Sequence, residues 1–353
     1  MKPYFSMSYP TGVLSLFHLR IQHRFTCLLV LSGCLTLCPG ALLTGQSVNS
    51  SPDYLTYHSL INQAEVHLSE RHFQQALNTY DEIFDSYSFV FERDYKIAIQ
   101  LAAYQEKDEK VLKFLQKGFR NGLDLKEVKK LPFLKKIRNS PGWDRIENAY
   151  DSLRAASLNP VDIPTRETVW GMYKKDQKKA MGALLRIGDK AQIAYAEKNF
   201  APHSEEQLSQ LTDVINMGGY PGEKRIRNDY WASTILSHHN SISSAYNQSD
   251  TLYTNLKPLL LEALKAGDIS PYELAMIEDW RIATVSGWSE PGYGYLNPPR
   301  TLTLAKTDSL RAVIGLRSVS LRNRLVAVEV ETGMDFFLPD WVQGKIQIKT
   351  EEE

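Results

Sequence analysis

Apolar residues recur every three to four positions through most of the chain, a spacing typical of helices with one buried face. The spacing is consistently helical from residue 53 to about residue 157. After the proline-containing segment 159–164 it predicts seven further helices, near residues 165–199, 204–217, 229–247, 250–266, 270–286, 307–315 and 318–331. We therefore predict an all-α protein.

Capping residues mark the ends of several predicted helices. Ser140-Pro141 and Ser270-Pro271 each place a proline in a first helical turn, where its missing N–H costs nothing. Glu273 completes a capping box with Ser270. Gly267 follows an apolar run and is predicted to end that helix in the left-handed conformation.

The pattern divides the chain into four parts. A chain of 353 residues is long for one hydrophobic core, which favours two domains. We predict a signal peptide over 1–45, a helical repeat domain over 53–157, a second helical domain over 164–332, and a C-terminal tail over 333–353. The segment 159–164 (NPVDIP) is the predicted boundary between the two domains.

The first 45 residues have the features of a secretory signal. Lys2, Arg20 and Arg24 precede the uncharged stretch 25–43, and small residues follow it. We expect cleavage near Gly45. An uncleaved membrane anchor and lipidation at Cys34, which follows Leu-Ser-Gly, are the alternatives. Each of these routes places residues 50–353 outside the cytoplasm, in the periplasm or secreted.

Composition excludes several classes of function. All three cysteines lie in the leader, at positions 27, 34 and 38, so the remaining chain offers no thiol nucleophile and no disulfide framework. Lys+Arg and Asp+Glu each number 41. Removing the three leader cations leaves 38 bases against 41 acids, a net charge of −3, which disfavours nucleic acid as a partner.

Residues 53–120 resemble tetratricopeptide repeats. Small and aromatic residues stand at the offsets of that family, namely Ala64, Ala76 and Tyr80, followed 34 residues later by Ala98 and Phe114. Lys110 departs from the pattern, which has a small residue there. Two such repeats need a cap, and we expect the following segment to provide it with Leu131, Phe133, Leu134, Trp143 and Ile146. The resemblance implies either a groove for a protein or peptide partner or a support for the second domain.

Ionisable residues fall on the apolar faces of three helices in the second domain. In the first helix Asp176 lies within the stripe formed by Val169, Tyr173, Ala180, Leu184, Ile187 and Ala191, with Gln177 at its edge. In the third helix His238 lies within the stripe and His239 at its edge. In the fifth, Glu278 and Arg281 share a face with Leu274, Ile277 and Val285. Buried ionisable groups are costly unless paired, so we expect these side chains to meet, either as a structural network or as a binding or catalytic cleft.

Residues 165–320 resemble an uncharacterised bacterial helical domain family, found alone or behind tetratricopeptide-like repeats in exported proteins. The resemblance is carried by Asp176-Gln177, Gly219-Tyr220-Pro221-Gly222, His238, Ala275-Met276-Ile277-Glu278-Asp279, Tyr293-Gly294-Tyr295, and Arg311 ahead of Ile314-Gly315-Leu316. This chain has Trp280 where the family has arginine. It also lacks the family's glutamine before the loop tyrosine, in the region Ser289-Glu290-Pro291. The resemblance implies candidate residues, altered in this copy, but no reaction.

No motif identifies a cofactor or metal. The chain has no phosphate-binding glycine loop, no G-x-S-x-G and no H-E-x-x-H. The adjacent residues His238 and His239 point about 100° apart on a helix and are poorly placed to bind one ion together. A zinc site of His238 with Asp176 and Asp279 has no further support, so we assign neither a metal nor a cofactor.

Two functional hypotheses follow. The first is an exported, non-enzymatic protein that binds a partner or small ligand through the repeat block and the 165–320 domain, with Gln177, Glu278, Arg281, Tyr293, Tyr295 and Arg311 as candidate ligand-binding residues. The second is a hydrolase-type enzyme whose candidate catalytic residues are Asp176, His238 and Asp279. In that case Arg281 or Arg311 would bind an anion, and the loop 287–299 would act as a lid.

Overall fold

The structure is a computed structural model that describes residues 53–157, 160–338, 342 and 344–350. Over these residues it contains helices and no strand, with one isolated bridge between Arg300 and Lys349, so the all-α prediction is confirmed. None of the described helices is both long and apolar enough to span a membrane. The predicted signal peptide lies outside the described residues.

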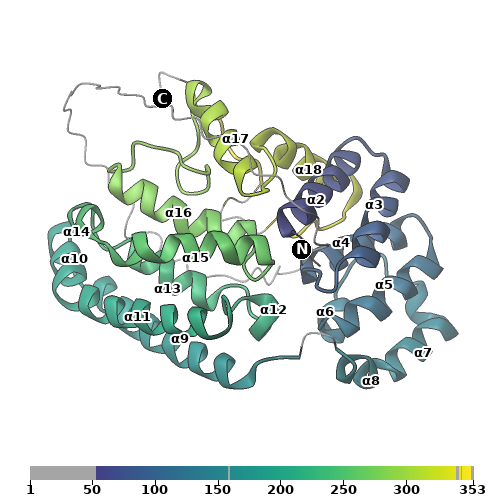
Figure 1. Cartoon of the computed structure of the whole chain (residues 1–353). Helices are drawn as coiled ribbons and strands as arrows, with labels where there is room; N and C mark the ends of the chain where they lie inside the picture. Colours follow the sequence, from purple (N-terminus) through teal and green to yellow (C-terminus); the bar gives the residue numbers. More distant parts are fainter. Residues whose placement is uncertain (1–52, 158–159, 339–341, 343, 351–353) are drawn as a thin grey trace, which may run out of the picture. The chain divides into compact units, whose positions relative to one another are not determined.

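The first block is built from paired helices (Figure 1). Its elements are α2 (Tyr54–Ser69), α3 (Phe73–Ser86), α4 (Glu92–Tyr104), α5 (Asp108–Arg120), α6 (Leu125–Val128), α7 (Pro141–Asn148) and α8 (Tyr150–Ala155). α2 packs against α3, and α4 packs against α5. Ala64, Ala76 and Ala98 are fully buried, and such small side chains allow the helices to approach closely. Lys110 forms an ion pair with Asp81 at 2.7 Å.

The segment after α5 covers the end of this block. Leu131, Leu134 and Trp143 are buried in the same apolar core as the repeat helices. Ile146 packs against that core while partly exposed, whereas Phe133 is 37% exposed and has a φ of 67°. α7 begins as predicted, with the Ser140 hydroxyl accepting from the Trp143 amide.

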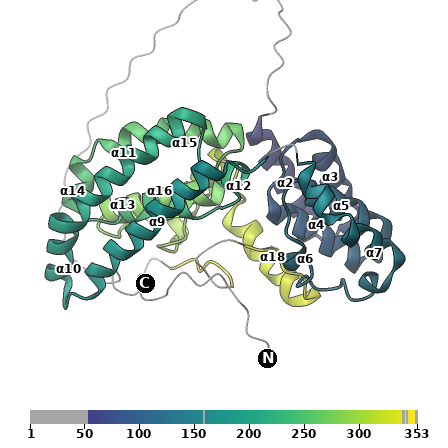
Figure 2. The same ribbon diagram turned by 90° about the horizontal axis from the view of Figure 1, so that it is seen from below.

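The second block surrounds α13 (Figures 1 and 2). Its elements are α9 (Ile163–Leu184), α10 (Asp189–Tyr195), α11 (Ala201–Gly218), α12 (Glu223–Ile226), α13 (Trp231–Asn240), α14 (Ser244–Ser249), α15 (Leu252–Ala266), α16 (Pro271–Val285) and α17 (Leu304–Val313). The last described helix, α18 (Val319–Thr332), follows. α13 packs against α9, α11 and α16. The capping box at Ser270 and the left-handed cap at Gly267 (φ 73°) are both present.

Two predicted helices are interrupted. The first long helix ends at Leu184. Gly188 then adopts a φ of 85°, a backbone conformation that residues with a side chain rarely adopt. Ile187 is therefore 97% exposed, and the prediction of one apolar stripe from 165 to 199 is wrong beyond this break. α10 instead continues through a π-helical turn (Ala196–Phe200) into α11. The helix predicted over 229–247 is divided where Ser243 caps α14.

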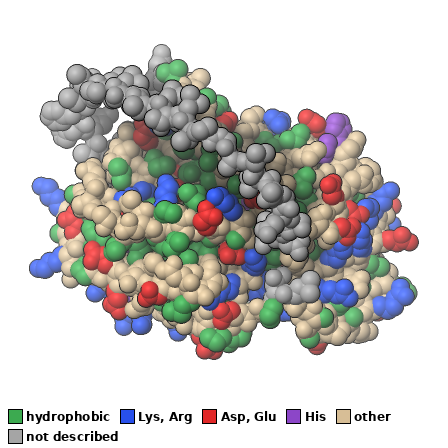
Figure 3. All heavy atoms as spheres, viewed as in Figure 1, with side chains coloured by type: hydrophobic (Ala, Val, Ile, Leu, Met, Phe, Trp, Pro, Cys, Tyr) green, Lys and Arg blue, Asp and Glu red, His purple; other side chains and the backbone are tan. Residues whose placement is uncertain are grey.

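The last described helix, α18, lies against α2, the first helix that the structure describes. Both views show the two helices together (Figures 1 and 2). We predicted residues 319–332 as part of the second domain, and the buried side chains Leu321, Leu325 and Val328 of α18 lie in the apolar core of the first block. On the face shown in Figure 3, basic and acidic side chains are interspersed.

Candidate functional site

Asp176 on α9 and His238 on α13 meet, as their positions on apolar stripes predict. His238 Nδ1 lies 2.6 Å from Asp176 Oδ2. Asp176 is fully buried, whereas 15% of the His238 side chain is exposed. The Gln177 amide also lies within 3.4 Å of Asp176 Oδ2. The pair therefore combines a buried carboxylate with an imidazole that reaches solvent.

The carboxylate determines the protonation of this imidazole. Burial alone lowers the pKa of His238, but the charge and hydrogen bond of Asp176 more than offset it, so the pKa is raised above the ordinary value. His203 on α11 also feels the Asp176 charge, yet burial keeps its pKa below the ordinary value. Both histidines pack near the Phe200 ring. The environment of His238 favours the protonated imidazole, and that of His203 favours the neutral one.

His239 is more deeply buried than predicted. It was placed at the edge of the stripe, but its side chain is fully buried, and Nδ1 lies 3.0 Å from Ser204 Oγ. Nε2 lies 3.3 Å from Asp250 Oδ2. The order Ser204, His239, Asp250 is that of a nucleophile, base and orienting acid. All three side chains are almost wholly inaccessible, so this chain of contacts joins α11, α13 and the start of α15 and offers no entry for a substrate.

Arg281 and Glu278 on α16 bind other side chains. Arg281 Nη1 donates to Asp250 Oδ2 at 2.7 Å. Burial raises the pKa of Asp250, but His239 and Arg281 outweigh it and bring the value to about 2. Glu278 accepts from Tyr253 and from Lys257 Nζ. In the described structure, the charged groups of both predicted ligand-binding residues are therefore paired with other side chains of the protein.

Asp279 anchors the aromatic loop to α16. Its carboxylate accepts from the backbone N–H groups of Tyr293 and Tyr295, the latter at 2.9 Å. Burial raises the pKa of Asp279 to about 7, although these amides and Arg311 oppose the shift. Gly292 has a φ of 57°, and a Cβ there would lie 2.2 Å from Asp279 Oδ1. We predicted Asp279 as a candidate catalytic residue, but its hydrogen bonds hold the backbone of the aromatic loop.

Arg311 holds the same loop from the other side. This fully buried residue donates from Nη1 to the Tyr293 carbonyl at 2.7 Å and from Nε to the Arg317 carbonyl at 2.6 Å. Its guanidinium lies 4.9 Å from the centre of the Tyr295 ring. The motifs at Asp279, Tyr293, Tyr295 and Arg311 therefore converge in one cluster around the aromatic loop. Residues 291–295, the centre of the predicted lid, are buried and are hydrogen-bonded to Asp279 and Arg311.

A buried ionic network, which no sequence pattern predicts, joins α2 and α4 to the turn between α17 and α18. Glu65 on α2 pairs with Arg317 and with Arg93 of α4, the latter at 2.8 Å. Arg93 also pairs with Asp94 at 3.0 Å, and Tyr57 donates to Asp94 at 2.5 Å. Burial alone would raise the pKa of Glu65, but the two guanidiniums lower it overall. The only sequence signal is that Glu65 shares a helix face with the apolar residues Ile61 and Leu68, which are both buried.

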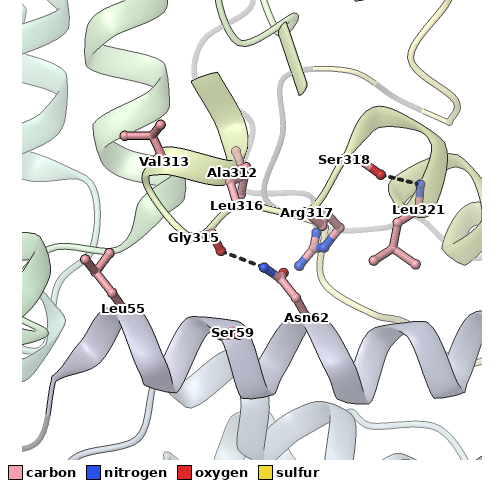
Figure 4. Close-up of a pocket in the computed structure, with 10 residues that line it drawn as sticks. All are labelled: Leu55, Ser59, Asn62, Ala312, Val313, Gly315, Leu316, Arg317, Ser318 and Leu321. Carbon is pink, nitrogen blue, oxygen red and sulfur yellow. Dashed lines mark hydrogen bonds between the residues drawn. The ribbon is translucent and has the colours of Figure 1, made fainter. Parts of the chain in front are cut away.

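A pocket of about 330 Å³ lies beside this network (Figure 4). It is bounded by α2 on one side and by the end of α17 and the start of α18 on the other, with Leu55, Ser59, Asn62, Ala312, Val313, Gly315, Leu316, Arg317, Ser318 and Leu321 as its lining. Asn62 Nδ2 donates to the Gly315 carbonyl at 3.0 Å across the pocket. In Figure 4 the Arg317 guanidinium lies beside the Asn62 side chain.

Comparison with known proteins adds no identity. No family model matches the chain, and neither a curated protein nor a solved structure shows significant similarity to it. The resemblances to tetratricopeptide repeats and to the uncharacterised helical domain family therefore stay predictions.

Proposed function

We propose that this chain is an exported, non-enzymatic helical protein that binds a small ligand in the pocket between α2 and residues 312–321. The observation that carries the proposal is the pocket itself, which is formed jointly by the repeat block and the end of the second block. Its volume of about 330 Å³ falls in the range of small-molecule sites, roughly 300–1,000 Å³. Five of the ten lining residues have apolar side chains, and Ser59, Asn62, Arg317 and Ser318 supply polar groups that would orient a ligand.

The polar side of the pocket favours a ligand with an oxygen acceptor. Arg317 Nη1 is buried and has no hydrogen-bond partner among the described residues. The Arg317 side chain is only 1% exposed, so the guanidinium must turn toward the pocket before a ligand oxygen can accept from this N–H. Satisfying the N–H group would then recover about 1–3 kcal/mol. Leu55, Leu316 and Leu321 would contact an apolar body. The expected ligand is therefore a small molecule with a short apolar chain and a carboxylate or carbonyl group.

Matched surface variants test this proposal. Val313 in the pocket lining is 71% exposed and Val330 on α18 is 85% exposed, so glutamate at either site leaves the core intact. We expect octanoate or N-acetylleucine to raise the melting temperature of the wild type and of Val330→Glu. Val313→Glu should weaken binding at least tenfold through charge repulsion, and octylamine should not bind. Equal responses of the two variants, or no response to either acid, would contradict the proposal.

The Asp176–His238 pair favours a hydrolase-type enzyme as the second candidate. A partly exposed imidazole at 2.6 Å from a buried carboxylate is the arrangement of a general base and its orienting acid. An activated ester such as p-nitrophenyl acetate provides the test. His238→Gln should lower kcat/KM by roughly 10²–10⁴-fold, whereas Glu262→Gln, at an exposed glutamate on α15, should not. Equal rates in all three proteins would exclude this candidate.

A further inference from the structure

The turn between α2 and α3 brings together three side chains that bind metals in other proteins. α2 ends at Ser69, Glu70 caps it, Arg71 adopts a φ of 61°, and α3 begins at Phe73. This tight reversal places His67 on the last turn of α2 beside Glu70 and His72. One ligand atom from each of the three lies within 4.8 Å of the others.

The distances fit a single transition-metal ion. Two ligands of a tetrahedral zinc ion at about 2.0–2.1 Å from the metal lie roughly 3.4 Å apart. His72 Nδ1 and Glu70 Oε2 are already 3.3 Å apart. Both side chains are about half exposed, so they can rotate to bring the third ligand into range without disturbing the core.

The surroundings leave these ligands available. His67 Nδ1 is buried without a hydrogen-bond partner among the described residues. Arg71, the cation between Glu70 and His72, is directed elsewhere: its guanidinium pairs with Glu331 on α18 and donates to the Ser69 carbonyl at 2.7 Å. The nearest arginine in sequence is therefore neutralised by another acid. In Figure 3 histidine side chains gather at the surface at this end of the molecule.

We propose that His67, Glu70 and His72 form a surface site for a divalent transition-metal ion, best fitted to zinc. Two imidazoles and a carboxylate provide three protein ligands and leave the fourth position to water. His67 lies on α2, Glu70 caps its end and His72 is the N-cap of α3, so the ion would fix the turn between α2 and α3. The spacing is H-x-x-E-x-H, which differs from the H-E-x-x-H of zinc proteases because the ligands span a turn rather than one helix.

A local measurement is needed because the leader also contains cysteines and histidines, residue types that can bind zinc. Hydrogen exchange of the full chain should be followed with and without Zn²⁺, in peptides that cover residues 66–76. We expect Zn²⁺ to slow exchange there at least tenfold in the wild type and in Glu82→Gln, a control at an exposed glutamate on α3. The variants His72→Asn and Glu70→Gln should lose that protection.

Two further comparisons complete the test. Mg²⁺ should give no protection, since it prefers oxygen ligands. Without metal, the variants should show wild-type exchange and circular dichroism because Glu70 and His72 are exposed. Absence of zinc-dependent protection in the wild type, or equal protection in His72→Asn, would overturn the proposal.

Discussion

At the scale of single residues, the Asp176–His238 hydrogen bond should control the charge of the imidazole. Replacing Asp176 with Asn removes the charge that raises the pKa of His238, while burial, which lowers it, persists. We expect the pKa of His238 to fall below about 6.5 in Asp176→Asn, measured by NMR titration of the imidazole carbons. An unchanged titration would show that the pair does not form in solution.

The Asp176–His238 pair should also make the stability of the protein depend on pH. A histidine whose pKa is raised on folding stabilises the protein fully below its unfolded value, and that contribution is lost as the pH rises through the folded value. Wild-type stability should therefore decline more steeply above about pH 6.5 than that of Asp176→Asn.

His58 should act in the opposite direction. Burial, with Arg93 nearby, lowers its pKa to about 3, so the folded protein keeps this imidazole neutral. The unfolded chain takes up a proton near pH 6.5, and stability is therefore lost as the pH falls from about 6.5 toward 3. Urea unfolding between pH 4 and 7 should show this loss. In His58→Gln the acid limb should be flatter, and an identical limb would contradict the assignment.

At the scale of elements, Asp279 should fix the aromatic loop to α16. Asp279→Asn replaces one carboxylate oxygen with an amide, so one of the loop N–H groups loses its acceptor, at a cost of about 1–3 kcal/mol. Amide exchange at 293–296 should rise. Glu290→Gln, in the same loop but paired with Lys306 at the surface, is the control and should change little. Equal exchange in the two variants would contradict the anchoring role.

The elements that could be predicted from sequence are those with a local chemical cause. Ser140, Gly267 and Ser270 marked helix ends because caps act within one turn. The break at 185–188 was missed because apolar periodicity continues through Ile187, and only the φ of Gly188 ends it. Asp176 and His238 could be paired because each lies on a stripe. Glu65 and Arg317 are 252 residues apart, and no local pattern joins them.

At the scale of the whole molecule, the Glu65 network joins α2 and α4 to the turn between α17 and α18. Glu65→Gln removes the negative charge that pairs with the buried guanidiniums of Arg317 and Arg93. We expect the free energy of unfolding to fall by about 3–5 kcal/mol. Glu331→Gln is the matched control, because its pair with Arg71 lies at the surface, about half exposed, and such pairs contribute little to stability. Chemical denaturation of both variants should show this difference, and similar losses would contradict it.

The pocket depends on that network, since Arg317 both pairs with Glu65 and lines the cavity. The most direct test is a crystal structure of the full chain soaked with a library of small carboxylates and amides. We predict a bound fragment between α2 and residues 312–321, with an oxygen within hydrogen-bond distance of Arg317 Nη1 or Asn62. Fragments bound elsewhere while this pocket holds only water would contradict the proposed function.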